Sequence, residues 1–451
     1  MKKNTNTFLV LFLVSFSVLS QNFLYNSEQF GLQGSMLGGS VVAGAEDESM
    51  TFYNPAGIFK SPSKVSISLL QPEYKNFGFD KFWGNNEVSE INVDYGLKPS
   101  VISFKFKVKN LDIAFLKISK SNLTDKFNSK RQVLENGIQA TQYFEYEYTG
   151  EDRWFGFGAS LPIGKNLHFG LSQFMTFASF TYKNEILLED FDTSTQNQVG
   201  DYFNSSINGL YSNIGFATKI GVLFDTNRHD FGFTITTPTY FRINKSGSLN
   251  SMLVNINATQ NSALQNIDNN LTPTIKTPWE FSFGYSFAFK NNGKFWLSTN
   301  YHLEISEYEM ATIKTLGNDL PWMNGSKEVF NFNVGYSHKI SNNLELSSAF
   351  RTNNFAYENK QTTINTIRNT IIDGNHMHFV LGSKFKVGRH RVLLGIDWGT
   401  LVNVPNEDRF DFISNIGKLS PNLQGLTKNS VSILFTYGFI LDGLKSLVKR
   451  D

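Results

Sequence analysis

The feature that most constrains this chain is a strict two-residue alternation that returns in many short segments. From Trp279 to Phe289, every odd position holds a large apolar residue and every even position holds a small, polar or acidic one. A period of two is the pattern of a β-strand with one apolar and one polar face. The same pattern recurs in segments 102–108, 231–236, 330–337, 392–399 and 431–440. We therefore expect an all-β protein built of many antiparallel strands.

The composition places these strands in a membrane. The 451 residues include 43 Phe and 17 Tyr but only 18% charged residues, which is unusual for a water-soluble protein. The mean hydropathy of −0.24 is too polar for a bundle of membrane helices. After the first 20 residues, no stretch reaches the roughly 18 apolar residues that a membrane helix needs. Together these properties predict a transmembrane β-barrel of a bacterial outer membrane.

Charge and cysteine content exclude other classes of protein. There are 41 basic and 39 acidic residues, so the net charge of +2 gives no basic surface for nucleic acid. The absence of Cys excludes disulfides and thiolate metal sites. We expect no cofactor.

The first 20 residues read as a secretory signal peptide. Met1, Lys2 and Lys3 form a positive start, and residues 8–19 form a largely apolar run of 12 residues. Ser17 and Ser20 place small residues beside a cleavage point next to Gln21. Such a run is too short to span a bilayer, and the pattern is typical of a removed export signal.

Short turns and long polar connections alternate along the rest of the chain. The short turns lie near residues 110, 164–165, 226–227, 291–293, 341–343 and 388, and the long connections are 73–98, 121–152, 183–212, 244–278, 309–327, 356–375 and 402–429. This alternation is typical of outer-membrane barrels, whose periplasmic turns are short. It predicts 14 strands, at 65–72, 99–108, 111–120, 153–163, 166–182, 213–225, 229–243, 279–289, 294–308, 328–339, 343–355, 376–387, 389–401 and 430–440.

The even number of strands places both ends of the barrel, residues 63–441, on the periplasmic side. Residues 140–148 (ATQYFEYEY) are an alternative further strand, but we assign them to a loop because another strand would make the number odd. Residues 442–451 follow as a periplasmic C-terminal extension.

The segment before the barrel, residues 21–62, is predicted to be a plug, or hatch, inside the lumen. Residues 31–58 contain six Gly, three Ala and three Ser, and small residues allow backbones to approach closely. A barrel of this size needs water or a plug to fill its lumen. The alternative is a disordered periplasmic tail, which would not need the apolar Phe23, Leu24, Phe30 and Phe52.

Two motifs carry a resemblance to a known family. Residues 38–49 (GGSVVAGAEDES), closed by residues 53–57 (YNPAG), resemble the hatch signature of the FadL/TodX family, and residues 277–285 (TPWEFSFGY) resemble one of its strand openings. The resemblance implies a 14-stranded outer-membrane barrel with an N-terminal hatch that takes up long-chain fatty acids or other hydrophobic compounds by ligand-gated passive diffusion. Release would follow a shift of the hatch, through the lumen or a lateral gap at a kinked wall strand.

The resemblance also assigns candidate residues. The hatch and gating residues are Gly38, Gly39, Gly44, Asp47, Asn54, Pro55 and Ala56. One departure is the end of the chain, because such barrels usually end on an aromatic residue, whereas Phe439 is followed by residues 440–451. The position of the assembly signal therefore stays open.

Ligand contacts are harder to assign from the sequence. The candidates are Phe30, Phe174 and Trp296 as apolar contacts, and Arg242 and Arg351, near the outer strand ends, as partners of a carboxylate. The alternation also points Lys105, Lys107, Lys219 and Lys384 inward. The alternative is that such cations pair across a polar lumen with Glu280, Glu304 or Asp397. Pro238 interrupts a strand and marks either a wall kink or a bulge without a role.

The sequence offers little support for an enzymatic function. His376 and His378 have no third ligand nearby, so we expect no metal site. Residues 158–165 resemble a phosphate loop only loosely, with the wrong spacing and no helix to follow. No Ser-His-carboxylate arrangement supports the alternative of a barrel phospholipase or protease, and we expect no enzyme.

The expected partners are a hydrophobic small molecule and outer-membrane lipid, with the protein a monomer. The alternative function is a FadL-like barrel that acts as a scaffold or shuttle in protein secretion, like a type IX accessory barrel. The inward positions of Phe174 and Trp296 favour an apolar pocket and hence transport.

Overall fold

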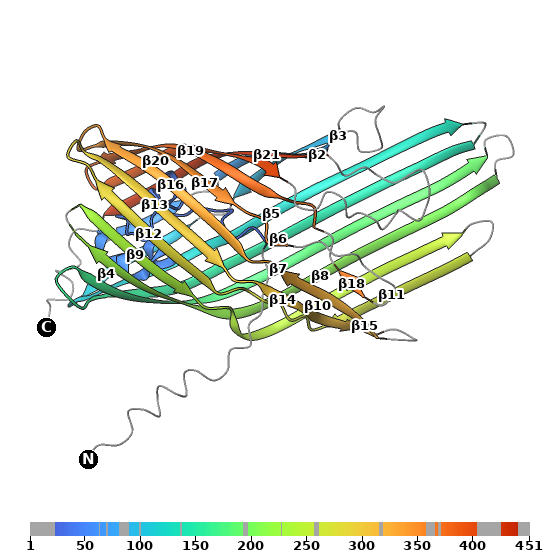
Figure 1. The fold of residues 1–451 in the computed structure, drawn as a ribbon, viewed down its shortest axis with the longest axis horizontal. Coiled ribbons are helices and arrows are strands. Elements are labelled where there is room, and N and C mark those ends of the chain that lie inside the picture. Colours follow the sequence, from blue (N-terminus) through green and yellow to red (C-terminus); the bar gives the residue numbers. More distant parts are fainter. Residues whose placement is uncertain are drawn as a thin grey trace, which may run out of the picture.

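The chain forms a closed antiparallel β-barrel with a short N-terminal segment inside it (Figure 1). The structure, a computed structural model, describes residues 23–62, 64–68, 71–80, 90–98, 101–135, 138–192, 197–226, 228–256, 261–314, 319–357, 366–368, 371–403 and 425–440. The expected signal peptide and the C-terminal extension lie outside the described residues.

Several positions in the wall are formed by two successive strands with a short break between them, such as β9 and β10. The strands are β1 (Lys64–Ser68), β2 (Gln71–Phe79), β3 (Glu90–Lys98), β4 (Ile102–Val108), β5 (Leu111–Glu135), β6 (Ile138–Pro162), β7 (Leu167–Asp192), β8 (Asn197–Asp225), β9 (His229–Thr236), β10 (Tyr240–Ile256), β11 (Asn261–Leu271), β12 (Glu280–Ala288), β13 (Gly293–His302), β14 (Ile305–Ile313), β15 (Leu320–Ser326), β16 (Val329–Lys339), β17 (Leu344–Asn353), β18 (Ile367–Arg368), β19 (Asn375–Val387), β20 (His390–Asn403) and β21 (Leu426–Ile440).

The barrel closes at the end where the short turns lie. There the ladder runs β1, β4, β5, β6, β7, β8, β9, β12, β13, β16, β17, β19, β20 and β21, and β21 pairs with β1 again. Each neighbour runs antiparallel to the next. The expected 14-stranded barrel is confirmed.

The opposite end of the barrel differs from the sequence prediction. Four strands, β5 to β8, contain 25, 25, 26 and 29 residues, although about 9–11 residues suffice to cross a membrane. In Figure 1 they run well past most of the wall. The predicted loops 121–152 and 183–212 are therefore mostly strand. Much of 73–98, 244–278 and 309–327 is strand as well. Residues 140–148 belong to β6 and form no additional strand.

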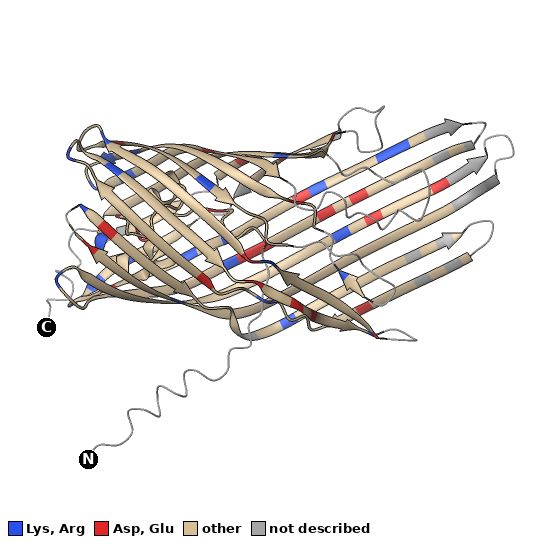
Figure 2. Ribbon diagram, in the orientation of Figure 1, with Lys and Arg blue, Asp and Glu red and all other residues tan. Residues whose placement is uncertain are grey.

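The outward faces show where the membrane band ends. Along β6, the outward-facing Phe157 and Phe155 are about half exposed, as lipid-facing side chains are. Between Arg153 and the projecting end of β6 at Ile138, the outward side chains are mostly polar, among them Glu147 and Glu145. These glutamates form ion pairs with neighbouring strands, including Lys126–Glu147 at 2.9 Å. Figure 2 shows charged residues along these projecting strands. We place the edge of the apolar band near Arg153, so the projecting part lies in water.

Helices contribute little to the described structure. In the residues that it covers, no helix is long and apolar enough to cross a membrane. The three helical segments, α2 (Leu32–Met36), α3 (Met50–Tyr53) and the 3₁₀ helix η1 (Pro55–Lys60), all belong to the segment inside the barrel.

Candidate functional site

The segment inside the barrel is a compact body that fills the lumen near the short turns; we call residues 23–61 the hatch. From residue 30 to residue 58, every side chain is buried except those of Glu46 and Phe52. Asp47 organises its centre, because its carboxylate accepts hydrogen bonds from the backbone N–H of Gln33 (2.7 Å) and Ser49 (3.0 Å). The Asn54 side chain accepts from Ala56 N–H (3.1 Å) and donates to Val42 O (2.8 Å). Pro55 follows as the first residue of η1.

Glycines in the wall make room for the hatch. A Cβ added to Gly232 would lie 2.0 Å from Val42 O, and one added to Gly284 would lie 2.4 Å from Ala43 N. Both are impossible contacts with backbone, so these two positions admit glycine alone. Inward glycines that lie against the hatch occur on eight wall strands: Gly158, Gly170, Gly221, Gly232, Gly284, Gly335, Gly382 and Gly438. The small residues that alternate with apolar residues in the sequence thus form the wall surface against which the hatch packs; we call this surface the glycine seat.

Polar side chains of the wall hold the hatch backbone. Ser160 and Ser172 each donate to a hatch carbonyl at 2.8 Å, those of Ala56 and Thr51. Val42 N–H donates to Ser298 Oγ at 3.1 Å. Near the short turns, Lys60 Nζ lies 2.7 Å from Asp225 and 3.1 Å from Asp230. The hatch is therefore fixed by directed bonds as well as by shape.

A group of charged side chains is buried in the lumen where the hatch meets the projecting half. Lys219 is 2% exposed, and its Nζ lies 3.5 Å from Glu280 Oε1 and 4.3 Å above the ring of Phe52. His302 lies 4.0 Å from the same carboxylate and stacks on Tyr25 with ring centroids 4.3 Å apart. The cavity between these groups has a volume of about 20 Å³, so hatch side chains occupy most of the site.

Lys120 reaches the same cavity through a β-bulge. In the ladder between β5 and β6, Ser119 pairs with Arg153 and Ser121 pairs with Asp152, so Lys120 is an extra residue. Its Nζ lies 4.6 Å over the ring of the inward Trp154. The bulge therefore places a second lysine in the lumen while the alternation on both sides is kept.

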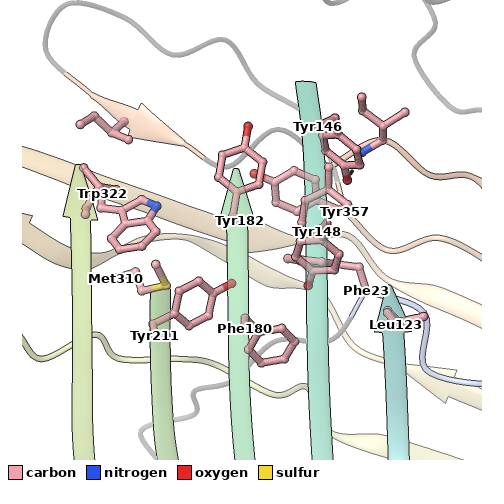
Figure 3. Close-up of a cluster of buried hydrophobic side chains, with 14 of the residues drawn as sticks. Phe23, Leu123, Tyr146, Tyr148, Phe180, Tyr182, Tyr211, Met310, Trp322 and Tyr357 are labelled. Carbon is pink, nitrogen blue, oxygen red and sulfur yellow. Dashed lines mark hydrogen bonds between the residues drawn. The ribbon is translucent and has the colours of Figure 1, made fainter. Parts of the chain in front are cut away.

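Aromatic side chains fill the lumen of the projecting half (Figure 3). They come from the inward faces of β5 to β8, from β14 and β15, and from the hatch and the segment around Tyr357. Trp322 is fully buried and meets Tyr211 at 5.5 Å between ring centroids, and Tyr211 stacks on Phe180 at 5.3 Å. We call this set the aromatic cluster: Phe127, Phe144, Tyr146, Tyr148, Phe180, Tyr182, Tyr211, Trp322, Phe355 and Tyr357.

A charged network ties the far side of the aromatic cluster together. Lys428 Nζ lies 2.7 Å from both Asp125 and Asp373, and Asp373 lies 2.6 Å from His376. Burial raises the pKa of Asp373, but Lys428 and His376 outweigh it and hold that pKa well below its usual range. The carboxylate is therefore ionised at neutral pH and fixes residues 371–374 to the wall.

A second cavity, of about 400 Å³, lies on the opposite side of the hatch. Gly44, Ala45 and Glu46 of the hatch line it together with Trp296 and Lys294 of the wall. The hatch residues between Gly39 and Gly44 thus separate this cavity from the one around Lys219. Gly39 and Gly44 have φ values of +78° and +96°, which favour glycine.

Comparison with solved structures finds the same architecture. The toluene transporter TodX of Pseudomonas putida matches with a TM-score of 0.59 at 12% identity, covering 93% of this chain and 100% of that one. The toluene transporter TbuX of Ralstonia pickettii gives 0.57 at 12% identity, covering 93% and 100%. A Pseudomonas aeruginosa FadL homologue gives 0.55 at 10% identity, also covering 93% and 100%. The chain has the FadL/TodX fold.

No known sequence family and no curated protein matches the chain. The fold expected from the hatch motif is thus confirmed by the comparison of structures alone. The sequence identities to these structures, 10–12%, are too low for sequence comparison to detect the similarity.

Within the FadL/TodX fold, the predicted hatch residues all lie in the hatch. Gly38, Gly39 and Gly44 adopt positive φ, at +58°, +78° and +96°. Asp47 and Asn54 are fully buried and bonded as described above. Their structural setting agrees with the motif, and their part in gating stays a prediction.

The predicted ligand residues are spread over three places. Phe30 and Phe174 come together through Phe52, with ring centroids 5.3 and 6.5 Å from it. Trp296 lies at the cavity on the far side of the hatch. Arg351 is fully buried, where it donates to Asp397 (2.7 Å) and to the backbone of Asn26, so it holds the hatch instead of facing open lumen. Arg242 lies in β10, and its side chain is outside the described part.

Sequence reasoning missed several residues of this site. Phe52, Trp154, Lys120, Tyr25 and His302 all meet around the cavity. Alternation along β6 would have placed Trp154 inward. The position of Lys120 depends on a bulge that has no sequence signal.

Pro238 lies in a break between β9 and β10. Hydrogen bonds to Thr218 of the neighbouring strand β8 bridge this break. Thr237 N–H donates to Thr218 O, and Thr218 N–H donates to Thr237 Oγ1, both at 2.9 Å. On the outward side, Tyr240 and Thr218 donate to Gln173 Oε1 at 2.9 and 2.7 Å. The interruption is real, and the wall stays bonded across it.

Proposed function

We propose that the protein is an outer-membrane channel for the passive uptake of hydrophobic compounds, with the hatch as its gate. The observation that carries this proposal is the aromatic cluster, which lies in the lumen directly on the outer side of the hatch. A water-filled porin has a polar interior. An interior of stacked rings offers a path to apolar solutes and none to ions. In this orientation the short turns face the periplasm, and β5 to β8 project outward.

The ligand site of the proposed channel is the region around Phe30, Phe52 and Phe174. Its aromatic rings suit a hydrocarbon body, and the adjacent Lys219 and Lys120 suit a carboxylate. The rings alone suit a neutral hydrocarbon, and the two lysines add a partner for the carboxylate of a long-chain fatty acid. The named neighbours TodX and TbuX are toluene transporters, so both ligand classes belong in the test.

Gating follows from the small volume of the site. A cavity of about 20 Å³ cannot hold a fatty acid, so binding requires Tyr25, Phe30 or Phe52 to move. These side chains belong to the hatch. Ligand binding therefore pushes the hatch off its seat and opens the way past residues 39–44 to the periplasmic cavity.

We place the lateral exit of the proposed channel between β3 and β5. The ladder of β4 with β5 ends at the pair Ile102–Lys117. Beyond it, the ladder partners of β3 within the described residues lie on β2. The bulge at Lys120 disturbs β5 at the same level. One side-chain hydrogen bond, from Asn92 Nδ2 to Lys126 O at 3.4 Å, crosses from β3 to β5, whereas the break at Pro238 is bridged through the backbone N–H groups of Thr237 and Thr218.

An engineered disulfide between the hatch and the wall tests the proposal. Because the chain has no native Cys, the two introduced cysteines can pair only with each other. Val42 and Ser298 are hydrogen-bonded at 3.1 Å, and the pair Val42→Cys/Ser298→Cys would tie hatch to wall. In proteoliposomes with radiolabelled oleate or toluene, we expect oxidation to abolish uptake and reductant to restore it. The control pair Phe233→Cys/Phe283→Cys joins two wall strands at partnered outward positions and should leave uptake unchanged.

Equal uptake by the locked and unlocked protein would refute the gate. No uptake of either probe by the folded wild-type protein would refute the channel and favour the scaffold or shuttle in protein secretion.

A further inference from the structure

A depression of about 600 Å³ lies on the outward surface of the wall, away from the lumen. β6 supplies Glu151 and Arg153 at one margin, and β10 supplies Lys245 and its two neighbours at the other. Ser179 of β7 and Ser212 of β8 lie between them, because Glu151 pairs with Ser179 and Ser179 pairs with Ser212 across the ladder.

Small side chains and an irregular strand create this hollow. Ser179, Ser212 and Ser246 form one outward row, in which Ser212 Oγ and Ser246 Oγ are 2.9 Å apart. The ladder of β10 with β8 shifts register twice between Tyr240 and Ser246, and Asn244 has φ +50°. These bulges displace β10 from the regular surface. The result is a polar floor rich in hydroxyl groups.

The position of the depression coincides with the edge of the apolar band. On the membrane side it is lined by Phe177, which is 38% exposed, and by Ile214. Further out, β6 and β7 carry Glu147 and Lys183 on the same outward face. The hollow therefore lies where the polar headgroups of the outer leaflet meet the protein.

The charges of the lining favour an anion. Arg153 forms an ion pair with Glu151 at 2.5 Å, whereas Lys245 donates to a neutral group, Thr274 Oγ1, at 3.0 Å. Two cations thus stand against one carboxylate in the lining. Arg binds phosphate oxygens well, and hydroxyl-bearing side chains suit the hydroxyls of a sugar.

We propose that this depression binds one phosphorylated glycolipid of the outer leaflet. Its phosphate lies between Arg153 and Lys245, its sugar lies over Ser179 and Ser212, and an acyl chain follows Phe177 and Ile214 toward the membrane. A 600 Å³ hollow exceeds the needs of a free phosphate and suits a sugar phosphate. The inference rests on the proposed outer-membrane location but is independent of what the lumen carries.

Native mass spectrometry of the full chain in detergent tests the site, with purified lipid A and chemically dephosphorylated lipid A as probes. We expect one lipid A to be retained by the wild-type protein and at least tenfold less by Arg153→Gln/Lys245→Gln. The control Lys126→Gln/Lys183→Gln removes two cations from the same outward face, where they pair with Glu147 and Glu145, and should retain lipid A as the wild type does.

Three outcomes would overturn the site: equal retention by the Arg153→Gln/Lys245→Gln variant, equal retention of the dephosphorylated probe, or displacement of lipid A by millimolar inorganic phosphate. Uptake of oleate by the same variant in phospholipid vesicles separates the two proposals. We expect that uptake to be unchanged, so a failed channel leaves the lipid site standing, and a failed lipid site leaves the channel standing.

Discussion

The two halves of the lumen are filled in different ways. In the periplasmic half, the backbone of the hatch lies against wall glycines and is held by directed hydrogen bonds. In the projecting half, aromatic side chains fill the space; most come from the strands, and Phe23 of the hatch together with Phe355 and Tyr357 of a connecting segment completes the packing. Because the hatch backbone fits the wall glycines to within tenths of an ångström, we expect the hatch to leave its seat only as one rigid unit. Rings in contact can instead shift one at a time. The difference suggests a gate on the periplasmic side and an adaptable path on the outer side.

The largest effect is expected from a methyl-bearing side chain in the glycine seat. Gly232→Val or Gly284→Val places carbon atoms within about 2.5 Å of hatch backbone, so the hatch cannot seat while the wall still closes. We expect oleate uptake in proteoliposomes to become at least tenfold faster, because the aromatic cluster admits apolar solutes once the hatch is displaced. Gly96→Val is the control, because a Cβ there meets nothing within 4 Å. A valine variant with wild-type oleate uptake would show that the seat is not what closes the channel.

Loss of the Asp47 carboxylate should loosen the hatch without opening the wall. Asp47→Ala leaves the N–H groups of Gln33 and Ser49 buried without their acceptor, at about 1–3 kcal/mol each. We expect faster protease cleavage within residues 23–61 and unchanged heat stability of the barrel. Asp47→Asn keeps one acceptor oxygen and should lie between the two. Equal cleavage of Asp47→Ala and wild type would contradict the role of Asp47.

In the outer half, Trp322→Ala should have a local effect. Trp322 is fully buried against Tyr211, and its removal costs about 3–5 kcal/mol in a packed core. Hydrogen exchange should rise in residues 305–313 and 320–326 and stay unchanged in the hatch. Trp398→Ala is a matched control, because Trp398 is 47% exposed on the outward face. Faster exchange in the hatch of Trp322→Ala would show that the two halves are coupled.

The smallest effect concerns pH. The pKa of Asp373 is lowered on folding, so its ion pairs contribute stability above the unfolded carboxyl value near 4 and lose it as pH falls through the lower folded value. Hydrogen exchange of residues 371–374, corrected for its intrinsic pH dependence, should therefore show constant protection from pH 7 to pH 5. Asp373→Asn should exchange faster throughout this range. Loss of protection between pH 7 and pH 5 in the wild type would contradict the role given to the Asp373 carboxylate.

Much of the fold could be predicted from the sequence because a barrel wall repeats one local rule. Alternating residues and turn residues are local signals, and they placed the short turns and the strands after Trp279 well. The prediction was wrong for residues 121–152 and 183–212, because the outward face there is polar and the segment reads like a loop. Its inward face, with Phe127, Tyr146 and Tyr182, carries the alternation that was overlooked.

The candidate site was less predictable. Arg351 has the right position for a ligand cation, but its charge is matched by Asp397, which the pairing of β19 with both β17 and β20 brings near. Pairing across the barrel joins residues 46 positions apart here, and up to several hundred positions apart elsewhere. The alternation offered Glu280 and Asp397 as partners for inward cations, but it does not say which cation meets which carboxylate.

The bulge at Lys120 has an evolutionary consequence. Since Ser119 and Ser121 pair with adjacent residues of β6, deletion of the single codon for Lys120 would leave a regular strand with every other side chain on its present face. One insertion of three nucleotides can thus add a charged group to the interior of such a barrel, and one deletion can remove it again. With the channel proposed above, relatives that differ by that codon are predicted to differ in the cargo they favour while sharing the rest of the wall.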